Sequence, residues 1–141
     1  MSVGVPSRSQ RDLPSNSDAP RVARRFVRDA LLALQAPDEL TRDFELAVSE
    51  LIANLVEYGD GDDITVSIDA DERHWMMEVR GGRVIPPALR DPSAWHVSDA
   101  DEDRGRGLGI VRAVVDAIRV ERQDGVVVVH CQMPRQATVG Q

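Results

Sequence analysis

The sequence predicts a two-layer α+β fold in which a mixed, mostly antiparallel sheet is covered on one face by about three helices. Apolar residues recur at helical spacing in two segments of the N-terminal half and in a third segment that follows a glycine-rich motif. Apolar and polar residues alternate in two further pairs of segments, as two antiparallel hairpins require. The predicted order is therefore helix, helix, strand, strand, lid, helix, strand, strand.

Both ends of the chain differ in composition from its middle. Residues 1–18 and 135–141 are polar and rich in Ser, Pro or Gln, so they cannot bury enough apolar surface to order themselves alone. We therefore expect one domain over residues 19–134, a flexible N-terminal segment with a candidate edge strand at "RDLP", and a disordered tail.

The first helix is predicted from about Pro20 to Leu34, with a basic stripe opposite its apolar face. The stripe consists of Arg21, Arg24, Arg25 and Arg28. Such a face can dock an acidic partner, and a solvated surface stripe is an equally good interpretation. The second helix is predicted to begin near Pro37 and to stop at Gly59.

The strands are predicted at residues 64–70 and 74–80, and then on either side of the Asp124-Gly125 turn within residues 118–133. A long segment between the two hairpins carries three prolines and the acidic run "SDADED". Segments of this kind usually act as lids or binding loops. The third helix is predicted to start at about Leu108.

Composition excludes several classes of function. The net charge of -7 argues against direct binding of nucleic acid, and the absence of lysine excludes chemistry that needs a P-loop lysine or a Schiff base. Neither a long apolar stretch nor a signal-peptide core is present, so we expect a cytoplasmic protein that does not contact membranes. The single Cys131 rules out an intrachain disulfide.

Two polar residues of interest lie within the largely apolar segment "ELAVSELIANLVEYG" of the second helix. Glu50 and Asn54 are four positions apart, so they share one helix face and can converge on one ligand. The alternative is a helix edge where both side chains reach solvent. The pair alone does not decide between these interpretations.

The second motif is "RGRGLG", residues 104–109. Gly105, Gly107 and Gly109 allow the backbone to approach a phosphate at a helix N-terminus, where Arg104 and Arg106 could add charge-assisted contacts. The alternative is an ordinary glycine-rich hinge before a helix that packs on the sheet.

Together these motifs resemble the histidine kinase-like ATPase fold (the GHKL or Bergerat superfamily), and within it the branch of anti-sigma-factor serine/threonine kinases. The resemblance covers roughly residues 12–134. It implies ATP with Mg2+ as cofactors, a sigma factor and an anti-sigma antagonist protein as partners, a role in transcription regulation, and a homodimer. It further implies that Glu50 is the catalytic base and that Asn54 holds Mg2+ on the ATP phosphates. Arg104, Gly105, Arg106, Gly107, Leu108 and Gly109 would bind the nucleotide.

One family motif is missing. The family carries Asp-x-Gly after the second strand of the first hairpin, where the carboxylate takes the adenine amino group. This chain reads "EVRGGRV" there, so only Gly82 is retained as a nucleotide-binding position, and Glu78 is the nearest carboxylate upstream. Loss of the buried acceptor should cost on the order of a hundredfold in ATP affinity.

Two functions therefore remain open. The first is an ATP-dependent serine/threonine kinase that phosphorylates an anti-sigma antagonist and otherwise sequesters a sigma factor. The second is a degenerate, non-catalytic adaptor with weak or lost ATP binding. The detached catalytic domain of a sensor kinase fits less well, because the chain has no dimerising phosphoacceptor helix.

Overall fold

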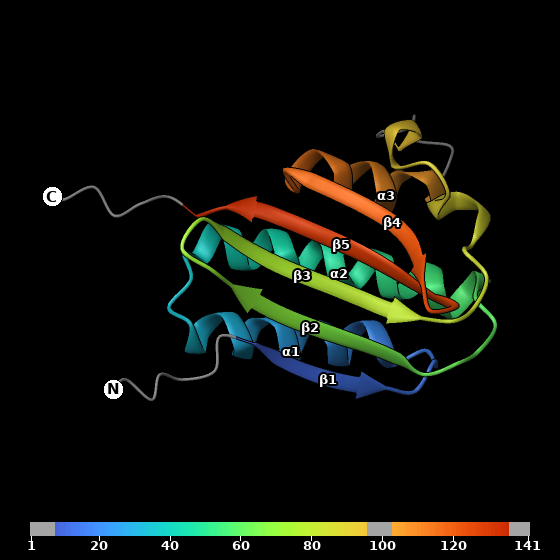
Figure 1. Cartoon of the computed structure of the whole chain (residues 1–141), viewed down its shortest axis with the longest axis horizontal. Coiled ribbons are helices and arrows are strands. Elements are labelled where there is room, and N and C mark those ends of the chain that lie inside the picture. The colour runs from blue at the N-terminus through green and yellow to red at the C-terminus, as the bar shows by residue number, and fades with distance from the viewer. Residues whose placement is uncertain (1–7, 96–102, 136–141) are drawn as a thin grey trace, which may run out of the picture.

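A five-stranded sheet carries three α-helices on one face in the part of the chain that this computed structural model describes, residues 8–95 and 103–135 (Figure 1). Only the backbone is described for residues 103–106. The arrangement confirms the predicted α+β sandwich with helices on one sheet face.

All described strand pairs are antiparallel. The strands are β1 (Ser9–Leu13), β2 (Ile64–Ala70), β3 (His74–Gly81), β4 (Ala117–Gln123) and β5 (Val126–Pro134), in the spatial order β1-β2-β3-β5-β4. β2 and β3 form one hairpin, and β4 and β5 form the other around Asp124 and Gly125, both of which have positive φ as this tight turn requires. The N-terminal β1 pairs with β2 and forms one edge of the sheet.

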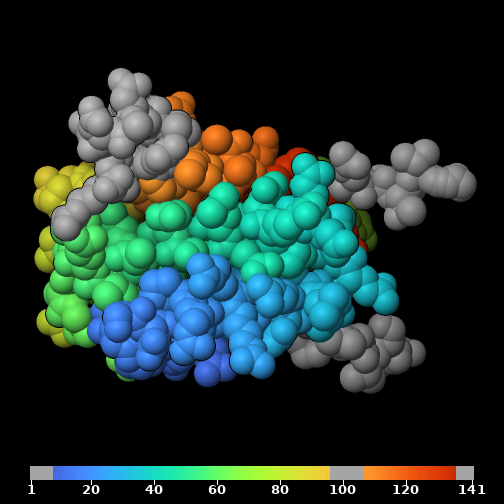
Figure 2. Space-filling view, turned by 180° about the vertical axis from the view of Figure 1, so that it is seen from behind, coloured from blue at the N-terminus to red at the C-terminus, as the bar shows by residue number. Residues whose placement is uncertain are grey.

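The helices are α1 (Ala19–Ala33), α2 (Asp38–Tyr58) and α3 (Asp103–Val114). Pro20 lies in the first turn of α1, and Asp38 and Glu39 in the first turn of α2, where carboxylates complement the helix dipole. Figure 2 shows α2 lying between α1 on one side and α3 on the other. α2 is therefore the central helix, in contact with both neighbours.

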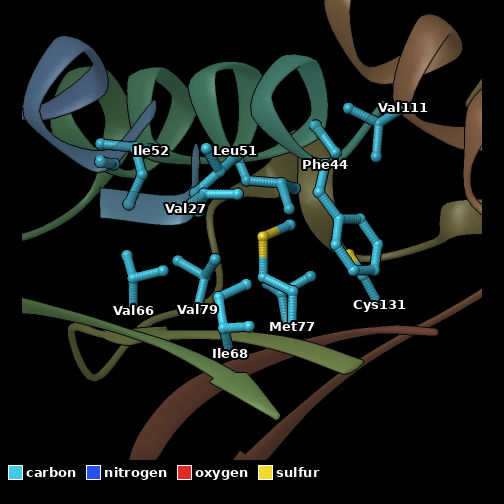
Figure 3. Packing of buried hydrophobic residues seen from close by; sticks show 14 of the residues in the cluster. Val27, Phe44, Leu51, Ile52, Val66, Ile68, Met77, Val79, Val111 and Cys131 are labelled. Carbon is cyan, nitrogen blue, oxygen red and sulfur yellow. The ribbon is translucent and has the colours of Figure 1, made fainter. Parts of the chain in front are cut away.

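The core lies between the helices and the inner face of the sheet (Figure 3). Fully buried side chains of α2, including Phe44, Leu51 and Ile52, meet those of β2 and β3, including Ile68 and Val79. Strand residues that alternate with these face away from the helices, on the outer face of the sheet. The hydrophobic face of α2 is thus fixed against the sheet, which orients its remaining faces toward α1 and α3.

The start of the third helix and the lid differ from the prediction. α3 begins at Asp103 and not near Leu108, so all three glycines of "RGRGLG" lie inside the helix. Glycine costs about 1 kcal/mol relative to alanine inside a helix, which is why the sequence pattern favoured a loop. The lid contains two short 3-10 helices, η1 (Pro87–Leu89) and η2 (Pro92–Ala94), and its acidic run at residues 98–103 lies almost wholly outside the described residues.

Candidate functional site

Glu50 lies on the face of α2 that meets α3. Its side chain is half-buried and packs directly on the Cα atom of Gly107. A Cβ atom built on Gly107 would lie 3.1 Å from the Cγ of Glu50 and would overlap its carboxylate. Glu50 and Gly107 are 57 positions apart in the sequence. Their contact therefore brings the two sequence motifs together in the structure.

Asn54 lies one turn further along the same helix and is buried, with 8% of its surface exposed. Within the described part of the chain, its Oδ1 atom has no hydrogen-bond partner. A buried acceptor without a partner costs about 1–3 kcal/mol, so it usually indicates a ligand, an ion or a water. An amide oxygen is also a suitable Mg2+ ligand. The residue present here therefore fits a metal that is bound together with phosphate.

The glycine-rich motif contributes backbone and close packing. The first four N–H groups of a helix have no partner within the helix, and in α3 these groups belong to residues 103–106. Gly107, Leu108 and Gly109 follow and are buried, with Leu108 in the hydrophobic core. Their predicted contact with nucleotide stays a prediction. The structure does not describe the side chains of Arg104 and Arg106 or the surroundings of Gly105.

A carboxylate that sequence patterns did not predict, that of Asp60, lies beside the end of β3. Gly82 has a φ of 79°, and Asp60 from the α2–β2 loop accepts a hydrogen bond from the backbone N–H of Arg83 at 2.9 Å. This hydrogen bond lowers the pKa of Asp60 below its ordinary value. The α2–β2 loop reaches this point because Ile64 pairs with Gly81 in the sheet. The sequence places Asp60 in a loop, because this residue follows the glycine that ends α2. No local pattern in the sequence indicates that Asp60 lies beside Gly82.

Glu78 does not replace the missing aspartate. It alternates along β3 with the buried Met77 and Val79, so its side chain faces away from the helices. There it accepts a hydrogen bond from Arg80 at 3.1 Å and lies 3.5 Å from the Nδ1 of His130. The carboxylate is therefore on the opposite side of the sheet from Glu50 and Asn54.

Hydrogen bonds connect the described part of the lid to α3. The indole Nε1 of Trp95 donates to the carbonyl of Ala88 at 2.8 Å, and Arg112 donates to the carbonyls of Ser93 and Trp95 at 2.8 and 3.1 Å. Trp95 is 5% exposed and belongs to the core cluster, together with Leu89. Arg112 of α3 therefore holds the described part of the lid against this helix.

Among the residues that the structure describes, no group of three or more His, Cys, Asp or Glu is arranged to hold a metal ion. None of the described helices is long and apolar enough to cross a membrane.

A model of the histidine kinase-like ATPase domain matches residues 13–132. The structure is similar to that of the RsbU and RsbW domains of Rv1364c from Mycobacterium tuberculosis, with a TM-score of 0.66 and 20% sequence identity. That match covers 92% of this chain and 33% of the other, so this chain spans a third of the length of that protein chain.

A second similar structure is the SiaB-SiaC complex from Pseudomonas aeruginosa, with a TM-score of 0.60 and 17% identity. It covers 89% of this chain and 88% of the matched chain. At these identities the two structures show a shared fold. No curated protein matches the chain.

Proposed function

Because the chain belongs to the family of histidine kinase-like ATPase domains, we propose that it binds ATP between α2 and α3 and acts as an anti-sigma-type regulator. In this role it sequesters a sigma factor and phosphorylates a serine or threonine of an anti-sigma antagonist. The motifs of α2 and α3 resemble those of anti-sigma kinases, and a similar structure contains an RsbW domain while another is a complex of two proteins. A cytoplasmic homodimer belongs to the same proposal.

The contact between Glu50 and Gly107, beside the unpartnered Oδ1 of Asn54, carries the proposal. Glu50 would accept the proton of the attacking hydroxyl, a contribution typically worth about 10²–10⁴ in rate. Asn54 would hold Mg2+, which supplies charge neutralisation to the ATP phosphates when bound. The N–H groups in the first turn of α3 would bind phosphate oxygens.

The adaptor function is favoured by one specific observation. β3 ends in Arg80-Gly81 and is followed by Gly82, and neither neighbouring carboxylate is free to bind adenine from the helix side. Asp60 holds the backbone of Arg83, and Glu78 lies on the other face of the sheet. We therefore expect phosphates to be bound better than the base, so that ATP binding is weak and ATP is poorly distinguished from GTP.

Calorimetry with Mg-ATP, Mg-ADP and Mg-GTP tests the nucleotide site. We expect similar affinities for ATP and GTP, and an Asn54→Ala variant that loses about tenfold or more in affinity because the buried oxygen is gone. Asn16→Ala is the matched control, since Asn16 is an exposed asparagine whose Oδ1 already accepts a hydrogen bond from the N–H of Asp18. Tight, adenine-selective binding would contradict the expected loss of base recognition. Undetectable binding at about millimolar nucleotide would contradict the kinase and leave the adaptor.

A further inference from the structure

An open groove lies between β1 and α1, away from the face of α2 that meets α3. Its volume is about 920 Å3. Val22 and Phe26 of α1 line it and pack partly against the core, while the exposed Arg11, Arg21 and Arg25 surround it. Five arginines and one carboxylate, that of Asp29, are among the described residues that line the groove. The groove therefore combines an apolar floor with a predominantly basic rim, on a protein whose net charge is -7.

Two of the arginines that line the groove have no hydrogen-bond or ion-pair partner among the described residues. Arg21 lies 3.7 Å from Asp18, and Arg28 is held by Glu45 at 2.8 Å. By contrast, neither Arg11 nor Arg25 meets a hydrogen-bond acceptor or a carboxylate in the part of the chain that the structure describes. Their guanidinium groups are therefore available to carboxylates from outside the molecule.

The same groove is bordered by the edge of the sheet. Among the described strands, β1 pairs with β2 alone, so every second residue of β1 directs its N–H and C=O groups away from the sheet. Arg11 alternates with Asp12, whose carboxylate accepts a hydrogen bond from Thr65 on the outer face. Arg11 therefore lies on the helix side, with the buried Leu13.

We propose that the groove binds an extended acidic segment of a partner protein, which adds a strand to β1. Alternate side chains of such a strand would point into the groove, where carboxylates meet Arg11 and Arg25 and apolar groups contact Phe26. A second copy of this chain fits less well, because pairing of two β1 edges would bring two basic rims together. The proposal does not depend on nucleotide.

The probe is a labelled peptide of about eight residues, a typical strand length, in which every second position carries Glu or Val in turn and the positions between them carry Thr. Fluorescence anisotropy should show binding that weakens with salt, and no binding of the matched peptide with Lys in place of Glu. The Arg11→Gln/Arg25→Gln variant should bind the acidic peptide at least about tenfold more weakly. Arg122→Gln, an exposed arginine on the opposite edge strand β4, should bind like the wild type. Equal affinity of both variants would refute the groove as the site.

Strand addition is tested with two peptides, one N-methylated at the odd positions and the other at the even positions. One of the two should not bind, because its methyl groups replace the N–H donors that face β1, and the other should bind like the parent peptide. If both methylated peptides bind like the parent, the contact is electrostatic only and strand addition is wrong. If sedimentation of the protein alone shows a dimer that the peptide dissociates, a second copy occupies the groove and the acidic partner is wrong.

Discussion

The carboxylate of Glu50 and the Cα atom of Gly107 are in direct contact, so this position of α3 has no room for any side chain beside Glu50. The contact joins the predicted base to the predicted phosphate motif. It also explains why a helix that contains three glycines is packed here, since only glycine lets α3 approach α2 this closely.

Gly107→Ala should destabilise the protein, and the effect should reverse when Glu50 is removed. In the wild type the added methyl group overpacks against Glu50, at a cost of about 1–3 kcal/mol that exceeds the gain in helix propensity. In a Glu50→Ala background the obstacle is absent, so Gly107→Ala should stabilise by up to about 1 kcal/mol. Chemical denaturation of the four proteins measures this coupling.

Glu39→Ala is the control background for that cycle, because Glu39 lies on the first turn of the same helix, remote from Gly107. There, Gly107→Ala should remain destabilising. The same loss of stability in the Glu39→Ala and Glu50→Ala backgrounds would show that Glu50 is not the obstacle.

Glu50→Gln should separate catalysis from partner capture. The change preserves size but removes the proton acceptor, so any phosphotransfer to the antagonist should fall by about 10²–10⁴. The proposed capture of a sigma factor needs no proton transfer and should be unchanged. Radiolabel transfer and co-purification measure the two activities, with Glu39→Gln as the matched variant. A folded Glu50→Gln protein that loses its partner would show that the two activities share this residue.

Asp60→Asn should remove a contribution to stability that depends on pH. The hydrogen bond from the N–H of Arg83 lowers the pKa of Asp60 from its ordinary value of 3.8, so the folded state favours the ionised carboxylate. This contribution is present above the unfolded-state pKa and is lost as the pH falls through the lower, folded-state pKa. Thermal unfolding of wild type and variant should therefore differ at neutral pH and converge in acid.

Asp116→Asn provides the comparison for Asp60, since Asp116 is an exposed aspartate outside this turn. A difference between wild type and Asp60→Asn that persists unchanged into acid would mean that the side chain acts by shape and not by charge.

Cys131 should be unreactive in the folded protein. Complete burial raises the pKa of its thiol to about 12, from an ordinary value of 9.0. Thiol reagents at about pH 8 should therefore react only after unfolding. Between these two pKa values the unfolded chain ionises this thiol and the folded chain does not, so folding stability should decline more steeply with pH than in Cys131→Ala. Rapid labelling of the native protein would contradict this.

Hydrophobic periodicity predicted the positions of α1, α2 and the strands well. Each of these elements has one face on the same core and another face away from it, so its apolar residues recur at a regular spacing. The segment 64–70 coincides with β2, and the Asp124-Gly125 turn lies where expected. Local patterns could not place the start of α3, because the penalty for glycine in a helix is offset by tertiary contact with α2.

Less of the candidate site was predictable. The pairing of Glu50 with Asn54 followed from helix geometry, but the Gly107 contact and the carboxylate of Asp60 beside Gly82 depend on segments distant in sequence. The sequence also indicated the arginine stripe, while Arg11 joins it only through the pairing of β1 with β2. The predicted nucleotide roles of the site residues stay predictions.

The position of β1 also bears on self-aggregation. β2 is lined by buried Ile64, Val66 and Ile68, so without β1 it would present an apolar, hydrogen-bonding edge of the kind that recruits other chains into fibrils. β1 covers that edge, and four of its own five residues are exposed. Because Arg11 and Asp12 are charged, the edge that β1 forms is less prone to pair with apolar strands than the edge of β2 would be. The charge of Arg11 thus opposes pairing of the β1 edge with apolar strands.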